Sequence, residues 1–418
     1  MLKKEMIFKK KLFFYFLGSL SLIVGFIFKE NSAGGGEHDF LIVYQFIEAF
    51  SKDLGSGFKR YFSNTAILVH PPSFYLLAGL LTKIFGNFFV FQIFYLILCL
   101  CLPYIFYKIL KEKFSNNTDY LFYLSLIIFL SPYFRTSAVW TLGDNLSLIF
   151  FGLFVFYLVR GEKRDSSSDF LFSLIFLVLC SYTRYYYAIF WIYFIFVYYQ
   201  KFKFKNLLNF LLLSIFFAIP VFIYFFYIIN YHNYFDLLKS YTTLNIFFPI
   251  IQILSILSFY FIPFIYFNFD KIKKFFKNRK KIIFFFFIST FFILIFEYFN
   301  FLPILGGGVF FKLYKSLEIN VIIYISIFIS IFSIIFFSDH EKGEIKLKNY
   351  ILFICLFASF PFSFIYQKYL DPLFFLLFFG LLESKQINKL IIHKNISLPL
   401  TYIYFAIFLL FALYYYLI

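Results

Sequence analysis

Long apolar stretches recur along the whole 418-residue chain and constrain its fold more than any other feature. Runs of about 17–25 apolar residues have the length that a helix needs to cross roughly 30 Å of hydrocarbon. The composition agrees, since 62% of the residues are hydrophobic and 28% are aromatic. A soluble domain could not hide this much apolar surface from water. The sequence therefore predicts an all-α, polytopic helical membrane protein.

The apolar segments predict about 13 transmembrane helices, in a range of roughly 11–13. Their approximate bounds are 12–28, 88–107, 119–133, 138–159, 169–183, 185–200, 207–229, 244–268, 282–299, 318–337, 350–366, 372–383 and 399–417. With this count the main Lys and Arg clusters, from 3–11 to 385–394, all fall on one face. Positive loops indicate the cytoplasmic side, which also takes the N-terminus. The net charge of +17 is explained by these loops and gives no indication of nucleic-acid binding.

One long external loop, about residues 29–87, is predicted after the first span. It begins with "SAGGGEHDF", in which three glycines precede Glu37, His38 and Asp39. The stretch "FLIVYQFIEAFSKDL" then places polar residues every three or four positions, which predicts a helix on the membrane surface. A second interfacial helix is expected in "HPPSFYLLAGLLTKIFG", started by the proline pair and stopped by Gly86.

Ionisable residues gather on the predicted external face. They are Glu37, His38, Asp39, His70, Arg135, Arg184, Lys312, Lys315 and Lys368. Asp144 is predicted about two turns inside the span 138–159, near the same face. An ionisable group within hydrocarbon is costly, so Asp144 is either functional or a structural partner of Arg135.

This set of groups fits a transfer reaction at the membrane edge. An external carboxylate can accept a proton from an incoming hydroxyl, and nearby cations can hold the phosphate of a lipid whose tail stays in the bilayer. Holding a lipid-linked donor at such a site also reduces the entropy that positioning costs. The pattern therefore favours sugar transfer from a polyprenyl phosphate.

Three stretches resemble the GT-C glycosyltransferases, in particular the protein O-mannosyltransferase and aminoarabinose-transferase branch. "GGGEHDFLIVYQFIEAF" is similar to the acidic motif after the first span, and "HPPSFYLLAGLLTKIFG" to the helix that closes the first loop. "SPYFRTSAVWTLGDNLSLIFFGLFVFYLV" resembles the family's Arg-then-Asp pair. Beyond these three, "YQKYLDPLF" has a weaker similarity to a late stretch that carries a cation. The resemblance covers about the first 160 residues in order and spacing.

The resemblance implies an inverting glycosyltransferase with a polyprenyl-phosphate sugar donor, an acceptor hydroxyl on a lipid-linked or surface glycan, and membrane lipid around it. The general base is either Asp39 or Glu37, with Asp39 preferred, because His38 separates the two acids that the family usually has adjacent. The chain is expected to form one integral-membrane domain over residues 1–418, without a soluble C-terminal domain. A bacterial cytoplasmic membrane is the favoured location.

The remaining candidate residues are those expected to bind the donor phosphate or a metal ion. The phosphate clamp is expected from Arg135, Arg184, Lys312, Lys315 and Lys368, with His38, His70 and Asp144 in supporting positions. No cofactor is firmly predicted, although a divalent metal on Glu37, His38 and Asp39 is an alternative use of the acidic motif.

Two other functions stay open at this point. One is a transporter or flippase for a lipid-linked saccharide, and the other is a polysaccharide polymerase. Transporters tend to place ionisable groups near the bilayer midplane. The position of these groups on one face favours the transferase.

Overall fold

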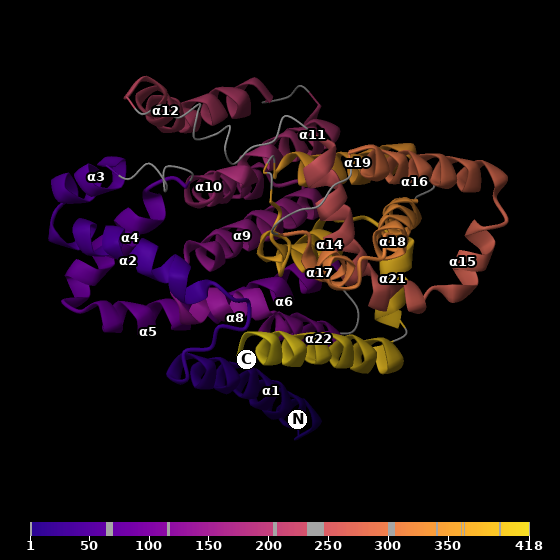
Figure 1. Cartoon of the computed structure of the whole chain (residues 1–418), viewed down its shortest axis with the longest axis horizontal. Helices are drawn as coiled ribbons and strands as arrows, with labels where there is room; N and C mark the ends of the chain where they lie inside the picture. Colours follow the sequence, from indigo (N-terminus) through magenta and orange to yellow (C-terminus); the bar gives the residue numbers. More distant parts are fainter. Residues whose placement is uncertain are drawn as a thin grey trace. The chain divides into compact units, whose positions relative to one another are not determined.

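The computed structural model describes residues 2–63, 70–114, 118–203, 207–231, 246–299, 306–339, 342–360, 362, 364–392 and 394–417. The described parts are mostly helical, joined by short turns and irregular segments, and contain no β-strand (Figure 1). The all-α prediction is therefore confirmed. The chain divides into two compact units, residues 1–238 with 405–418, and residues 239–404. Each unit is described by itself.

The first unit contains the elements from the N-terminus to α12 and the end of α22. Their bounds are α1 Leu2–Ile27, α2 Gly36–Lys52, α3 Leu54–Ser63, α4 Ser73–Phe85, α5 Phe88–Cys99, α6 Cys101–Lys113, α7 Thr118–Ser125, η2 Leu126–Leu130, α8 Pro132–Val139, α9 Gly143–Arg164, α10 Ser167–Thr183, η3 Tyr185–Ile189, α11 Phe190–Phe202 and α12 Leu207–Tyr231. Helix α9 packs against α10 and α6, and α2 packs against α3 and α4. Figure 1 shows α9 and α10 lying side by side.

The second unit is built around α14, which packs against α17 and α18. Its elements are α14 Phe247–Tyr266, α15 Phe269–Phe275, α16 Arg279–Phe299, α17 Gly308–Leu317, α18 Val321–Ser338, α19 Gly343–Ala358, η4 Gln367–Tyr369, α20 Leu373–Phe375, η5 Leu376–Leu381, α21 Lys385–Ile392 and the first part of α22, Lys394–Leu417. The rings of Phe261, Phe264, Phe374 and Phe378 contact one another in its core.

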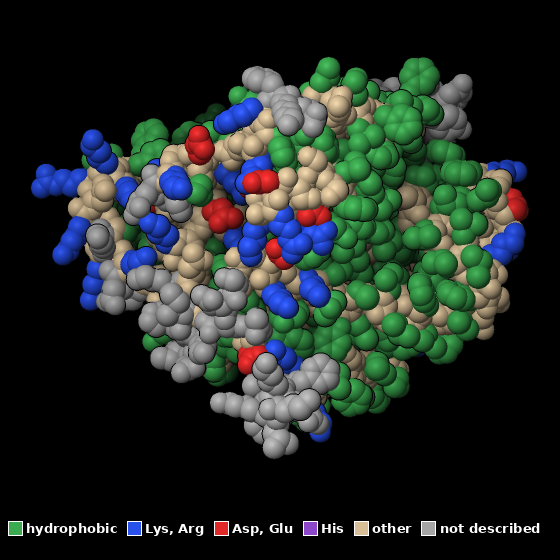
Figure 2. All heavy atoms as spheres, turned by 180° about the vertical axis from the view of Figure 1, so that it is seen from behind, with side chains coloured by type: hydrophobic (Ala, Val, Ile, Leu, Met, Phe, Trp, Pro, Cys, Tyr) green, Lys and Arg blue, Asp and Glu red, His purple; other side chains and the backbone are tan. Residues whose placement is uncertain are grey.

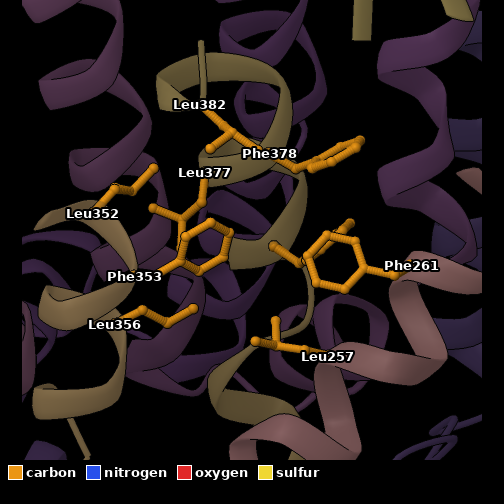
Figure 3. A pocket seen from close by; sticks show the side chains of 9 residues that line it. Leu257, Phe261, Leu352, Phe353, Leu356, Leu377, Phe378 and Leu382 are labelled. Atoms are coloured by element: carbon orange, nitrogen blue, oxygen red, sulfur yellow. The ribbon is translucent and has the colours of Figure 1, made fainter. Parts of the chain in front are cut away.

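The second unit also encloses a small cavity between α14, α19 and the segment 374–382 (Figure 3). The side chains of Leu257, Phe261, Leu352, Phe353 and Phe378 point toward one another there. Its volume is about 10 Å³, which is near the least that one water molecule needs. All of its lining side chains are apolar, so the cavity belongs to the core and offers no groups for chemistry.

Apolar side chains cover much of the surface, as a lipid environment requires. Leu208, Leu212, Ile215 and Phe216 on α12 are all more than half exposed. Figure 2 shows many hydrophobic side chains exposed at the surface. In lipid these exposed side chains carry no hydrophobic penalty, whereas in water they would.

The described residues contain fewer helices of membrane-spanning length and composition than the roughly 13 spans predicted. The described residues contain 8 helices that are long and apolar enough to cross a membrane, or 9 if the bent pair Asp119–Leu130 and Pro132–Val139 forms one span. Several predicted spans are shorter in the structure or broken into pieces. Helix α10 has 17 residues, α11 has 13 and α19 has 16, while the segment 372–383 holds only the short helical elements α20 and η5.

The interfacial helices of the first loop agree with the sequence patterns. Helix α4 follows Pro71 and Pro72 and ends at Gly86, whose φ is 69°. On α2, Gln45, Glu48 and Lys52 are exposed, and Phe46, Ile47 and Phe50 are buried on the opposite side against α3 and α4. Helices therefore form where both were predicted, and their position at the membrane interface stays a prediction.

Candidate active site

The turn before α2 is fastened to α8, and this fixes where the acidic motif lies. The Ala33 amide donates to Thr136 Oγ1 at 2.8 Å, and the Ser32 hydroxyl donates to the Pro132 carbonyl at 3.0 Å. The Trp140 indole donates to the Glu30 carbonyl at 2.9 Å. Segments about a hundred residues apart in the chain are thus joined directly at the start of the first loop.

The glycine triplet allows this close approach. Gly34 and Gly35 both have φ of 71°, a left-handed conformation that other residues rarely adopt. At Gly36, a Cβ atom would lie 2.4 Å from Thr136 Cγ2 and 2.8 Å from Trp140 Cδ1. The Gly34 and Gly36 amides already donate to Asn31. The triplet therefore serves a tight, pinned turn, and these two amides are not available to an anion.

We expect the substitution Gly36→Ala to destabilise the first unit by about 1–3 kcal/mol, as overpacking of a close contact does. The matched control is Gly343→Ala, because a Cβ atom there meets nothing within 4 Å. Thermal unfolding of both purified variants checks this. An unchanged unfolding midpoint for Gly36→Ala would show that the turn is not held against α8.

The three residues of the acidic motif differ in their surroundings. Glu37 and His38 are exposed in the first turn of α2, whereas Asp39 is half-buried. Consecutive residues on a helix point in different directions, so these three side chains do not converge. Among the described residues there is no group of three His, Cys, Asp or Glu side chains that could hold a metal ion.

Tyr75 links Asp39 to the rest of the site. It lies at the start of α4, is 2% exposed, and its ring contacts those of Phe46 and Tyr61. Burial raises the pKa of Tyr75; the carboxylates of Asp144 and Asp39 also raise it, whereas Arg184 acts in the opposite direction. Tyr75 therefore keeps its proton at neutral pH and stands among the charged groups of three other elements.

Asp144 and Arg184 form a buried ion pair beside Tyr75. The Arg184 Nε and Nη2 atoms donate to the two Asp144 carboxylate oxygens at 2.9 and 3.1 Å. Asp144 lies in the first turn of α9, and Arg184 caps the end of α10, so both helix dipoles favour the pair. Arg184 is 5% exposed, and its Nη1 atom has no hydrogen-bond partner among the described residues.

Two expectations about Asp144 were wrong. It does not lie two turns inside a span, because the helix breaks at residues 140–142, where Thr141 has φ of 52°, and α9 begins only at Gly143. It also does not pair with Arg135. Arg135 instead binds Glu30, with Nε donating to Oε1 at 2.7 Å, and its other nitrogens donate to Ser21 and to Glu30.

The Arg135–Glu30 pair joins the end of α1 to α8. Both side chains are 7% exposed. All three nitrogens of the Arg135 guanidinium donate hydrogen bonds within the protein, which favours a structural role over phosphate binding. His70 lies just before α4, where its backbone carbonyl accepts a hydrogen bond from the Tyr61 hydroxyl.

Basic side chains collect at the opposite end of the same helices. Arg160 on α9 donates to Asp169 on α10 at 2.9 Å, and Arg164 lies 3.3 Å from the Glu112 carboxylate of α6. Asp144 and Arg164 are 20 residues apart on α9, which is about 30 Å along a helix axis. This length matches the thickness of the hydrocarbon layer, so α9 is long enough to place Asp144 and the basic end on opposite sides of a membrane.

The lysine candidates belong to the second unit. Lys312 and Lys315 are exposed on α17, and Lys368 is half-buried with its ammonium 5.5 Å from the centre of the Tyr366 ring. The Gly307 amide donates to the Ile365 carbonyl at 2.8 Å, which fastens the start of α17 to the segment that carries Lys368. A Cβ atom at Gly306 would lie 2.8 Å from the same carbonyl. This second glycine triplet thus also serves close packing.

A comparison with known protein families gives a match that covers the chain from α4 to most of α12. Residues 69–227 match the family described as dolichyl-phosphate-mannose-protein mannosyltransferase. The match supports a GT-C superfamily glycosyltransferase. It contains Tyr75, Asp144 and Arg184, while Asp39 lies before it. No curated protein and no solved structure matches the chain.

The family and the apolar helices together support a multi-pass membrane glycosyltransferase that uses a polyprenyl-phosphate sugar. Two residues of this candidate site were not singled out from the sequence. Tyr75 is one of 36 tyrosines and carries no distinguishing pattern. Glu30 lies 105 residues from its partner Arg135. The position of Tyr75 one turn after Pro71 and Pro72 is the only local signal that pointed to it.

Proposed function

We propose that this chain transfers a sugar from a polyprenyl phosphate to an acceptor hydroxyl on the external face of the membrane, with inversion at the anomeric carbon. The acceptor oxygen attacks that carbon, and the bond between the carbon and the phosphate oxygen breaks. The proton of the hydroxyl passes to Asp39, and polyprenyl phosphate leaves as an anion. The observation that carries this proposal is the grouping of Asp39, Tyr75 and the Asp144–Arg184 pair within one unit.

The choice of Asp39 as general base rests on its surroundings. Its carboxylate acts electrostatically on the buried Tyr75, whereas Glu37 is exposed. A base that removes a proton in the transition state must be held beside the reacting groups. Glu37, on the exposed side of α2, meets this condition less well. Exposed His38 and half-buried His70 are assigned supporting positions.

Arg184 is the best candidate for binding the donor phosphate. Asp144 holds two of its nitrogens and fixes the plane of the guanidinium, while Nη1 has no acceptor among the described residues. A fixed donor in a buried setting stabilises developing negative charge more than a mobile surface cation does. Lys312, Lys315 and Lys368 remain further candidates for this role.

The separation of charges along α9 supports the proposed orientation. The Asp144 end carries the reactive groups, and the end near Arg160, Arg164 and Glu112 is rich in basic residues. By the positive-inside rule, the basic end is cytoplasmic and the Asp144 end is external. Ionisable groups at a helix end also fit an enzyme at the membrane edge better than a transporter with a midplane site.

Donor conversion in vesicles tests the function. The purified protein is reconstituted with polyprenyl phosphates that carry a labelled hexose or pentose, and total membrane glycan from the producing cells is added as acceptor. We expect label to move from the donor to the glycan fraction, with release of polyprenyl phosphate. If no donor of this class is consumed while the protein stays folded, the proposed function is wrong.

A further inference from the structure

Helix α8 is a short helix that holds two parts of the candidate active site. It has eight residues, all of them buried except the half-buried Tyr133, and residues 140–142 separate it from α9. Two consecutive polar residues of α8, Thr136 and Ser137, are 3% and 4% exposed. Buried polar side chains cost free energy unless they are hydrogen-bonded. The partners of these two hydroxyl groups therefore indicate what each residue does.

Thr136 faces the turn that precedes the acidic motif. Its Oγ1 atom accepts a hydrogen bond from the Ala33 amide at 2.8 Å and lies 3.3 Å from the Ser32 hydroxyl oxygen. Asp39 follows in the first turn of α2, where its amide donates to the Gly35 carbonyl at 2.9 Å. The contact with Thr136 therefore fixes where α2 begins, and with it the position of Asp39.

Ser137 faces the break in the chain before α9. Its hydroxyl donates to the Leu142 carbonyl at 3.1 Å and accepts from the Asn145 amide at 3.3 Å. The Asn145 side chain also donates to the Phe134 carbonyl of α8 at 2.9 Å. Leu142 and Asn145 precede and follow Asp144 in the chain. These bonds therefore fix the first turn of α9 and the carboxylate that it carries.

The two residues can hold different segments because they lie on different sides of one helix. Consecutive residues of a helix point about 100° apart. Trp140, four residues after Thr136, contacts the same turn and donates to the Glu30 carbonyl at 2.9 Å. Phe134, three residues before Ser137, supplies the carbonyl on the α9 side. One side of α8 thus holds the start of α2, and another side holds the start of α9.

We propose that Thr136 and Ser137 are positioning residues that set the separation between the general base and the phosphate-binding arginine. Thr136 places Asp39 through the turn before α2, and Ser137 places Arg184 through its ion pair with Asp144. The assignment rests on the proposed function, because it concerns residues that serve the same site. A misplacement of about 1 Å can lower a rate by about 10²-fold, so a fixed spacing between these groups matters for transfer.

Steady-state kinetics of the full chain in lipid vesicles separate the two roles. Thr136→Val keeps the shape of the side chain but cannot accept the Ala33 amide. We expect it to lower kcat about 10–10²-fold with little change in the KM for the polyprenyl-phosphate donor, because the base acts in the transition state. Thr136→Ser restores the acceptor oxygen and should transfer sugar as wild type does. Ser137→Ala should raise the donor KM about tenfold, because it loosens the pair that orients the arginine.

Hydrogen exchange followed by mass spectrometry tests the same contacts without turnover. In Thr136→Val, exchange should become faster in the segment 30–40 and stay unchanged in 140–147, and in Ser137→Ala the reverse should hold. The matched control is Ser173→Ala. Ser173 is a buried serine of α10 that donates to the Phe154 carbonyl at 3.1 Å, about 15 Å along α9 from Asp144. This control should leave both segments and the transfer kinetics as in wild type.

The outcomes separate this inference from the proposed function. Faster exchange confined to the matching segment, with a kcat loss in Thr136→Val that Thr136→Ser lacks and a raised donor KM in Ser137→Ala, supports the inference. It is overturned if either variant loosens both segments or neither, if Thr136→Ser loses as much activity as Thr136→Val, or if the donor KM of Ser137→Ala is unchanged. If wild type consumes no donor, the proposed function fails and the positioning roles fail with it.

Discussion

Asp39→Asn is expected to lower the rate of sugar transfer by a factor of about 10²–10⁴, the contribution typical of a general base. The amide cannot accept the proton of the attacking hydroxyl, although it keeps the size of the carboxylate. Because Asp39 is half-buried on α2 and packs into no core position, the variant should fold normally. The measurement is label transfer from the polyprenyl-phosphate donor in vesicles, at matched protein levels.

Glu37→Gln is the comparison that decides between the two acids of the motif. Glu37 is exposed, and we expect its substitution to change the rate by no more than a few-fold. The reverse result, a large loss in Glu37→Gln and little change in Asp39→Asn, would assign the base to Glu37. Normal transfer in both variants would contradict the proposal that a carboxylate of this motif is the general base.

Substitutions in the Asp144–Arg184 pair should affect the stability of the protein and its transfer activity differently. Removing one partner leaves a buried charge without its counterion, so Asp144→Leu or Arg184→Met alone should cost about 3–5 kcal/mol of unfolding free energy. Replacing both residues by apolar ones is often neutral, so the double variant should recover most of that stability. Transfer should stay reduced by about 10²–10³, as after loss of one electrostatic donor.

This double variant separates a structural pair from a phosphate-binding one. Thermal unfolding gives the stability, and donor conversion gives the activity. If the double variant recovers both, Arg184 only holds α9 to α10 and does not touch the donor. If its stability recovers while transfer stays low, Arg184 has the proposed role.

The sequence predicted those parts of the first loop that local chemistry determines. Pro71, Pro72 and Gly86 mark the ends of α4, and the spacing of Gln45 and Glu48 marks the exposed side of α2. These signals act over a few residues, because proline removes an amide and glycine permits a left-handed turn. For that reason the corresponding elements agree with the structure.

Pairings between distant segments could not be predicted in this way. The break before α9 uses Trp140, Thr141 and Leu142, and the single glycine beside it, Gly143, is of a kind that helices tolerate, so Asp144 was placed too deep. Which arginine it meets depends on how α10 packs on α9, and the sequence offered two arginines near the same face. Tyr75 became a candidate only once α4 was packed against α2.

The most direct test of the whole account is which side of the membrane the acidic motif on α2 and the basic end of α9 each face. Single cysteines are placed at exposed Glu37 and Lys163, in a chain whose exposed native thiol, Cys101, is replaced by alanine. A maleimide that cannot cross membranes is then applied to intact cells or sealed vesicles. The account predicts labelling of Glu37→Cys from outside, and labelling of Lys163→Cys only after the membrane is opened. Labelling of both from the same side would contradict it.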